Sequence, residues 1–180
     1  ASNDTRFLFT HGVDLLVETA RFYASRARHD KAADTYHLDD VAGPDEGHCE
    51  SRDNFYTNYL AKRNLLWAAD VLARMQAEDP EAYRAAGGRL NLRAQEPEQW
   101  RTVAAGLAFL FDPQTRVYEQ CADFYKLKEV PKDLLDTRKV WFVTVFPYQA
   151  LNQPDVLMAM MMFRDTFDPE RSEERRVGKE

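Results

Sequence analysis

One segment, residues 55–76, constrains the fold of this chain more than any other. It is the longest stretch in which apolar residues recur at helical spacing. Its middle, residues 65–72, is apolar on nearly every side, with Asp70 as the exception. A helix that is apolar all round is buried. The segment therefore predicts a long central helix whose middle is enclosed by other elements.

Helical spacing also recurs outside this segment. Residues 12–28 and 98–111 are predicted to be helices, and Asp112 with Pro113 is expected to end the second of them. Residues 153–163, which carry a cluster of Met side chains, are predicted to be a last, buried helix.

The remaining segments are less regular. Residues 35–41 are expected to be extended, and residues 113–150 to be irregular and rich in aromatic side chains. Long helices separated by such loops favour an all-α fold of helical hairpins over a βαβ fold. Residues 1–170 are assigned to one domain. Residues 171–180, which are dense in charge and have no apolar period, are expected to be a non-native or disordered tail.

Composition narrows the classes of function. The 180 residues can bury one sizeable core, and with a net charge of −6 and no basic patch, no nucleic-acid partner is expected. The longest apolar run, residues 156–163, is too short to span a bilayer, so no membrane partner is expected either. Cys49 and Cys121 show no metal-ligand spacing, and a reduced, cytoplasmic location is expected.

Residues 41–58, with the sequence VAGPDEGHCESRDNFYTN, carry the strongest chemical signal. A Gly-Pro turn presents Asp45 and Glu46, and His48 follows two residues later. A carboxylate raised on a turn at the mouth of a helix suits a general acid. Because neighbouring residues in an extended turn point apart, only one of the two carboxylates can face a substrate. The alternative interpretation is a surface Pro-Asp turn that caps the next helix.

This stretch is similar to the acid motif of glycoside hydrolase family 65, the inverting disaccharide phosphorylases such as maltose, trehalose and kojibiose phosphorylase. The family pattern is G-P-D-E-Y-H, four variable residues and then N-x-Y-T-N. The residues that match it are Gly43, Pro44, Asp45, Glu46, His48, Asn54, Tyr56, Thr57 and Asn58. Gly47 departs from the pattern where the family has an aromatic residue, as do Arg52 and Asp53 where Asp-Asn is usual.

Three other segments carry the resemblance. Residues 18–26 resemble the family's helix before the acid motif. Residues 119–127 resemble its E-Q-x-x-G-Y-F-x-L run, with Asp123 in place of Gly. Residues 152–156 resemble its K-Q-x-D-V run, with Asn152 in place of Lys.

The resemblance covers roughly residues 5–167 and implies a fold and an activity. The family's catalytic domain is an (α/α)6 toroid, of which this chain would be a part that is inactive by itself. The implied reaction is inverting phosphorolysis of an α-linked glucose disaccharide, with inorganic phosphate as co-substrate, no cofactor and Glu46 as the general acid. Glu46 is expected in a loop that opens onto a concave, aromatic-lined face. A homodimer of the full-length enzyme is compatible with the resemblance.

The resemblance also places substrate-binding residues. Asn152 and Gln153 fall where the family has its substrate-binding Lys-Gln pair, although Asn152 cannot supply the charge of a Lys. His48 either hydrogen-bonds a sugar hydroxyl, orients Glu46 or is a packed structural histidine. Asn58 and its upstream counterpart Asn54 are expected to tie the loop backbone rather than to touch sugar.

Alternative functions stay open. A hydrolase of the same family would use water and a second carboxylate, for which Asp45, Asp53 and Asp123 are the first candidates. A non-catalytic carbohydrate-binding or scaffold helical domain is the third interpretation. No metal is expected, because the His and carboxylate residues around Glu46 match no known ligand spacing.

Overall fold

The structure, a computed structural model, describes residues 4–48, 50–132, 147–164 and 167. Its contacts divide the chain into two compact units, one formed by Ala1–Asp39 with Asn58–Ala108 and the other by Asp40–Thr57 with Phe109–Glu180. The predicted tail, residues 171–180, lies outside the described residues. Over the described part of the chain, no helix has the length and apolar character needed to cross a membrane.

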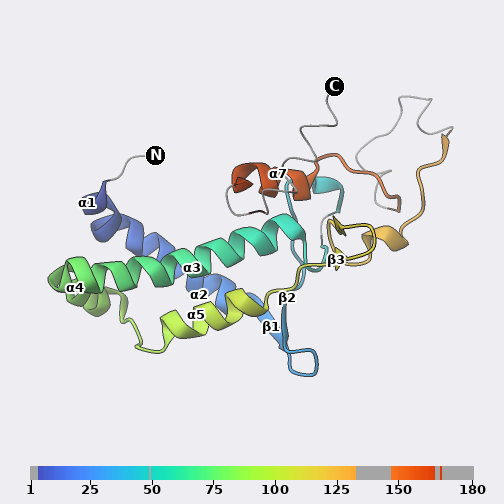
Figure 1. Cartoon of the computed structure of the whole chain (residues 1–180). Coiled ribbons are helices and arrows are strands. Elements are labelled where there is room, and N and C mark those ends of the chain that lie inside the picture. Colours follow the sequence, from blue (N-terminus) through green and yellow to red (C-terminus); the bar gives the residue numbers. More distant parts are fainter. Residues whose placement is uncertain (1–3, 49, 133–146, 165–166, 168–180) are drawn as a thin grey trace. The chain divides into compact units, whose positions relative to one another are not determined.

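The first unit is built mainly from helices. Its elements are α1 (Thr5–Phe7), a π-helical turn (Leu8–Gly12), α2 (Val13–Arg26), β1 (Ala27–Asp30), β2 (Thr35–Leu38), α3 (Phe55–Glu78, from residue 58 onward), α4 (Pro80–Leu90) and α5 (Glu96–Gly106). Helices α2, α3 and α5 lie side by side (Figure 1). Their buried apolar side chains form the core: Val13, Val17 and Ala20 of α2, Ala61, Leu65, Ala68, Ala69, Leu72 and Met75 of α3, and Trp100, Val103 and Ala104 of α5.

Helix α3 confirms the central prediction. It extends over Phe55–Glu78, against a predicted range of 55–76. Leu65 and Leu72 are buried, but Trp67 is 41% exposed, so the expectation that this helix is enclosed on nearly every side is wrong. The guanidinium of Arg63 lies 4.9 Å from the centre of the Trp67 ring, and this cation–π contact partly covers the open side.

The all-α prediction is wrong in one respect, because each unit contains a small antiparallel hairpin. In the first unit β1 pairs with β2, with Ala27 opposite Leu38. The hairpin turn is stabilised by Asp30, whose Oδ1 accepts the N–H of Ala32 at 2.9 Å, and by Asp34, which adopts a φ of 49°. Helix α2 therefore ends at residue 26 rather than at the predicted residue 28.

Helix α5 begins and ends earlier than predicted. It covers Glu96–Gly106 instead of residues 98–111. The backbone leaves the helix because Leu107 bridges to Tyr36, and the Ala108 N–H donates to the Tyr36 carbonyl oxygen at 2.9 Å.

Helix α4 was not predicted, although its ends carry clear signals. Asp79 caps its N-terminus by accepting the Ala82 N–H at 2.9 Å, and Pro80 occupies the first turn. Asn91 ends it in the left-handed conformation. Gly87 and Gly88 lower its helix propensity, which explains why the apolar period did not reveal it.

The second unit contains a 3-10 turn (Glu46–His48), β3 (Phe111–Asp112), β4 (Val117–Tyr118), a second 3-10 turn (Phe124–Lys126) and α7 (Asp155–Met162). The predicted helix 153–163 is confirmed, but its burial is not. Only Asp155 and Ala159 are buried, whereas Met161 is 75% exposed. The predicted irregular region 113–150 contains the short β3–β4 hairpin, and residues 133–146 lie outside the described part.

A buried carboxylate joins the helices of the first unit. Glu96 is 1% exposed, and its carboxylate accepts two hydrogen bonds from Arg21, at 2.8 and 3.0 Å. It also accepts the backbone N–H of Arg93 at 2.8 Å. The contact with Arg21 lowers the pKa of Glu96 from 4.5 to about 2, against the opposing effect of burial.

This contact should make stability depend on acid pH. Because the folded-state pKa of Glu96 lies below its ordinary value, the stabilisation is complete above about pH 4.5 and is lost as the pH falls towards about 2. Glu96→Gln should lower the free energy of unfolding at pH 7 by on the order of 2–3 kcal/mol, with little effect near pH 2. Urea unfolding across this pH range measures it. Glu98→Gln, an exposed change on the same helix, is the control. A pH-independent effect of Glu96→Gln would contradict the assignment.

Candidate active site

The acid motif forms a loop in which two adjacent carboxylates differ in burial. Asp45 is 1% exposed, whereas Glu46, which begins the 3-10 turn Glu46–His48, is exposed. Only Glu46 of the two carboxylates is therefore exposed. The side chain of His48 lies outside what the structure describes.

Asp45 is held by donors from three parts of the second unit. Its Oδ2 accepts the side-chain amide of Gln120 at 2.7 Å. Its Oδ1 accepts the backbone N–H of Gly47 at 3.1 Å and that of Asn152 at 3.3 Å. These contacts occupy both oxygens of Asp45 and leave the outward position to Glu46.

Asp155, the first residue of α7, is fully buried beneath the same loop. Its Oδ1 accepts the backbone N–H of Asp45 at 2.8 Å, and its Oδ2 accepts the side-chain amide of Asn54 at 2.7 Å. Its own N–H lies 3.3 Å from Oε1 of Gln120. We refer to Asp45, Asn54, Gln120 and Asp155 as the buried polar cluster.

Gly43 is needed for close approach rather than for an unusual backbone angle. A Cβ atom at this position would lie 1.9 Å from Oδ2 of Asp155 and 2.7 Å from the side-chain amide of Asn54. Its φ is not positive. The Gly-Pro sequence therefore reflects the carboxylate packed against its backbone as much as the turn itself.

The two Asn residues of the motif bind protein groups, as expected. Asn54 caps the start of α3, because its Oδ1 accepts the Thr57 N–H at 3.1 Å. Within the first unit, the side-chain amide of Asn58 donates to the carbonyl oxygen of Ala108 at 2.8 Å.

The predicted substrate-binding pair lies next to the buried polar cluster. Asn152 has an exposed side chain, and its backbone N–H contacts Asp45. Gln153 is half-buried, and its carbonyl oxygen accepts the N–H of Asp155 at 3.1 Å. The backbone of Asn152 thus contacts the loop that carries Asp45 and Glu46, which we call the acid loop.

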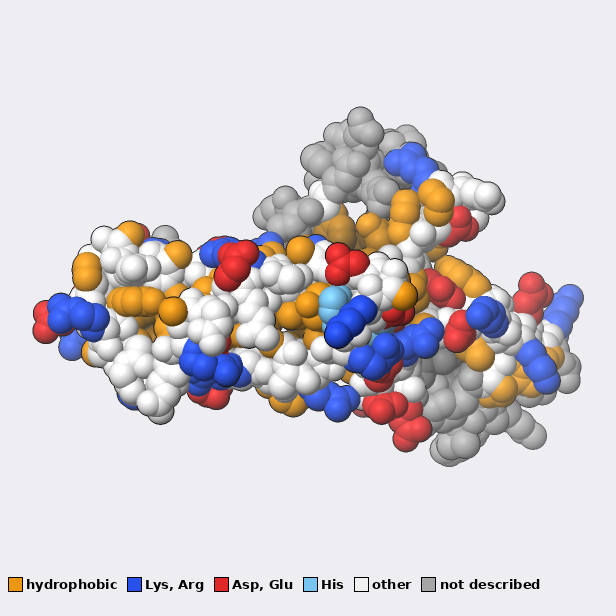
Figure 2. Space-filling view, turned by 90° about the horizontal axis from the view of Figure 1, so that it is seen from below, with side chains coloured by type: hydrophobic (Ala, Val, Ile, Leu, Met, Phe, Trp, Pro, Cys, Tyr) orange, Lys and Arg blue, Asp and Glu red, His pale blue; other side chains and the backbone are white. Residues whose placement is uncertain are grey.

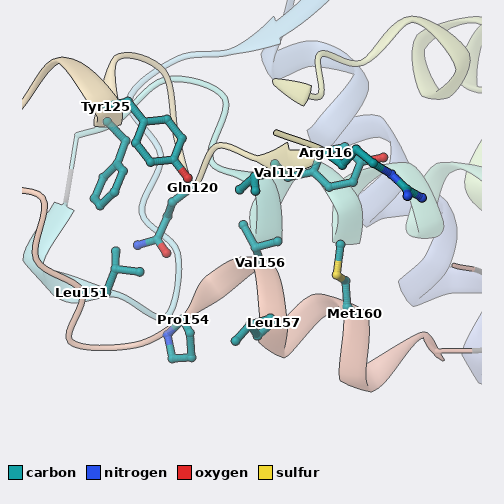
Figure 3. Close-up of a pocket in the computed structure, with 11 residues that line it drawn as sticks. Arg116, Val117, Gln120, Tyr125, Leu151, Pro154, Val156, Leu157 and Met160 are labelled. Carbon is teal, nitrogen blue, oxygen red and sulfur yellow. The ribbon is translucent and has the colours of Figure 1, made fainter. Parts of the chain in front are cut away.

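A hollow of about 350 Å³ lies in the same unit. In Figure 3, Val156 and Met160 point from α7 towards the segment that carries Arg116 and Val117. The complete lining consists of Arg116, Val117, Tyr118, Gln120, Phe124, Tyr125, Leu151, Pro154, Val156, Leu157 and Met160. Gln120 thus belongs to both the hollow and the buried polar cluster. The predicted aromatic-lined face exists in this unit, but Glu46, Asn152 and Gln153 are not among its lining residues.

Cys121 has a buried thiol near the carboxylates of this site. Burial, together with the nearby carboxylates of Glu119, Asp155 and Asp45, raises the pKa of the Cys121 thiol to about 11, so the thiol stays protonated near neutral pH.

On the face of the molecule drawn in Figure 2, basic and acidic side chains are interspersed.

Sequence reasoning missed the roles of Asp155 and Gln120. Both lie in segments that carry the family resemblance, residues 152–156 and 119–127, and this was the only available signal. The pairing itself could not be read from the sequence, because Asp155 is 110 residues from Asp45.

Comparison with known proteins shows the family to which this chain belongs. Residues 1–176 match the family model described as the glycosyl hydrolase family 65 central catalytic domain. The chain belongs to glycosyl hydrolase family 65. A kojibiose phosphorylase of Caldanaerobacter subterraneus subsp. tengcongensis is 30% identical over 177 residues, which cover 94% of this chain and 23% of the relative. An α,α-trehalose phosphorylase of Thermoanaerobacter brockii is 32% identical over 174 residues, which cover 93% and 22%.

Two further matches define the extent of the likeness. An uncharacterised glycosyl hydrolase of Mycobacterium leprae is 34% identical over 164 residues, covering 89% of this chain and 20% of the relative. A solved structure assigned as a kojibiose phosphorylase from the human microbiome superposes with a TM-score of 0.79 at 22% identity, covering 92% of this chain and 25% of that one. This family 65 chain therefore spans about a fifth to a quarter of the length of these relatives.

The close approach at Gly43 gives a stability prediction. Gly43→Ala should lower the free energy of unfolding by at least about 2–3 kcal/mol, because the new methyl group must displace a buried, hydrogen-bonded carboxylate. Gly87→Ala is the matched control: a Cβ there meets nothing within 4 Å, and it should stabilise α4 by about 0.5–1 kcal/mol. Urea unfolding measures both. Equal stability of the Gly43 variant and the parent protein would show that the loop tolerates the methyl group.

Proposed function

We propose that this chain is the acid-bearing part of an inverting glycoside phosphorylase that acts on an α-linked glucose disaccharide, with Glu46 as the general acid. The observation that carries the proposal is the contrast between Asp45, which is buried and hydrogen-bonded, and Glu46, which is exposed on the same loop. Membership of family 65 and the phosphorylase names of two relatives support it. An (α/α)6 toroid is the proposed fold of the complete catalytic domain.

The proposed reaction transfers a glucosyl group from the disaccharide to inorganic phosphate. Glu46 gives its proton to the glycosidic oxygen, the bond from C1 to that oxygen breaks, and an oxygen of inorganic phosphate bonds to C1 from the opposite face. The products are β-glucose 1-phosphate and the released sugar. The hydrogen carried by the phosphate then restores the proton on Glu46. Asn152, Gln153 and His48 are proposed to hydrogen-bond the sugar, and no cofactor takes part.

A hydrolase would need a second carboxylate that activates water. Asp45 has both oxygens occupied by donors, and Asp53 is buried. Asp123 is exposed, but its carboxylate lies 2.6 Å from Nζ of Lys126, which lowers its pKa. These surroundings support phosphorolysis over hydrolysis by a base from the described part of this chain.

Replacing the proposed acid tests its role. In the full-length protein, Glu46→Gln keeps the size of the side chain but removes its proton. Turnover of a disaccharide should fall by about 10²–10⁴-fold. Glu50→Gln, an exposed change on the same loop, should leave turnover unchanged. Steady-state release of glucose 1-phosphate measures both. Wild-type turnover in the Glu46 variant would remove Glu46 from the mechanism.

Phosphate dependence separates the two enzymatic alternatives. With kojibiose or trehalose as substrate, the full-length protein should release β-glucose 1-phosphate only when inorganic phosphate is present, because phosphate is the nucleophile. Chromatography of the products against phosphate concentration measures this dependence. Free glucose released at the same rate without phosphate would establish the hydrolase and reject phosphorolysis.

A further inference from the structure

Two segments that are distant in the sequence meet beneath the acid loop. Residues 43–54 carry Glu46, and residues 152–155 carry the proposed sugar-binding pair. Asp155 joins them, because its two oxygens accept the N–H of Asp45 at 2.8 Å and the side-chain amide of Asn54 at 2.7 Å. The N–H that it binds belongs to Asp45, the residue that precedes the proposed acid.

We propose that Asp155 is a positioning residue for the general acid: its carboxylate holds the Asp45 peptide and the Asn54 amide, and thereby sets the place of Glu46 relative to Asn152 and Gln153. The proposal rests on the function proposed above for Glu46. It assigns Asp155 no contact with substrate.

Two further contacts restrict movement of the acid loop. The Asn152 N–H lies 3.3 Å from Oδ1 of Asp45, so the sugar-binding segment contacts the acid loop directly. Gln120 bridges Asp45 and Asp155: its Nε2 donates to Asp45 at 2.7 Å, and its Oε1 lies 3.3 Å from the Asp155 N–H. The backbone at Asp45, directly before Glu46, therefore cannot move away from Asp155 without breaking buried hydrogen bonds.

Asp155 itself has little room to move. It is fully buried, and its Oδ2 is packed so closely against Gly43 that a Cβ there would lie 1.9 Å away. A general acid works only within hydrogen-bonding reach of the oxygen that it protonates, and a misplacement of about 1 Å can cost about 10²-fold in rate. A rigid support for Asp45, the residue before the acid, meets this requirement.

The donor and acceptor pattern provides a sharp test in the full-length protein. In Asp155→Asn, one acceptor oxygen becomes an amide that faces either the Asp45 N–H or the Asn54 side-chain amide, donor against donor. In the double variant Asn54→Asp with Asp155→Asn, the new amide instead donates to the new carboxylate. Asp at position 54 still offers an oxygen to the Thr57 N–H. The double variant keeps the net charge and the donor–acceptor pairing of the contacts at the Asp45 N–H, between positions 54 and 155, and at the Thr57 N–H.

The readout is turnover of two substrates, a disaccharide and dinitrophenyl α-glucoside, whose leaving group departs without a proton. Asp155→Asn should lower disaccharide turnover by about 10- to 100-fold while dinitrophenyl glucoside turnover changes by less than about 3-fold. The double variant should restore disaccharide turnover to within about 3-fold of the parent. Asp112→Asn is the control in the same unit: Asp112 is exposed, and an Asn could keep both of its turn hydrogen bonds.

The outcomes separate this proposal from the proposed function. If Glu46→Gln impairs disaccharide turnover but Asp155→Asn does not, only the positioning role is rejected. If Glu46→Gln has no effect, the acid assignment itself fails. Equal losses on both substrates that the double variant does not restore would make Asp155 a structural residue, as would loss of folding in the single and double variants alike. Selective loss with rescue would establish the positioning role.

Discussion

The packing of one carboxylate against one glycine supports the whole acid loop. Asp155 lies so close to the backbone of Gly43 that no side chain fits there, and in this position it accepts the N–H of Asp45 and the amide of Asn54. Burying a carboxylate is costly unless donors replace the lost water. The loop and the start of α3 supply these donors, so the loop conformation and the burial of Asp155 stabilise each other.

The first unit uses the same physical device. Glu96 is buried, and its carboxylate is bound by Arg21 and by the backbone of Arg93. In both units a carboxylate with several donors joins segments that are far apart in the sequence. The donors differ in charge. Glu96 is bound by the guanidinium of Arg21, which lowers its pKa, whereas the amides of Gln120 and Asn54 that donate to Asp45 and Asp155 are neutral. Breaking either contact leaves a buried charge or donor without a partner, which costs more than the contact itself contributes.

Burial gives adjacent carboxylates different roles. Asp45 and Glu46 are chemically almost alike, yet the first is surrounded by donors and the second is exposed. A carboxylate whose oxygens accept internal hydrogen bonds stabilises the loop, while its exposed neighbour is the one that solvent reaches. Asn152 stands where the family has a Lys, and this change does not remove its contact with the acid loop. The contact uses the backbone N–H of residue 152 and does not depend on its side chain.

The sequence alone determined the long helix α3 through its apolar period and the membership of family 65 through the acid motif, and it indicated that Asn54 binds backbone. It did not reveal the β1–β2 hairpin or the early end of α5, because these depend on pairing with residues such as Tyr36 that no local pattern specifies. Helix α4 was missed because two glycines lower its helix propensity, although capping residues mark both of its ends. Which of Asp45 and Glu46 faces outward, why position 43 is glycine, and what Asp155 binds were decided only by the tertiary structure. The reason is that hydrogen bonds between residues about a hundred positions apart arise from chain packing and leave no periodicity in the sequence.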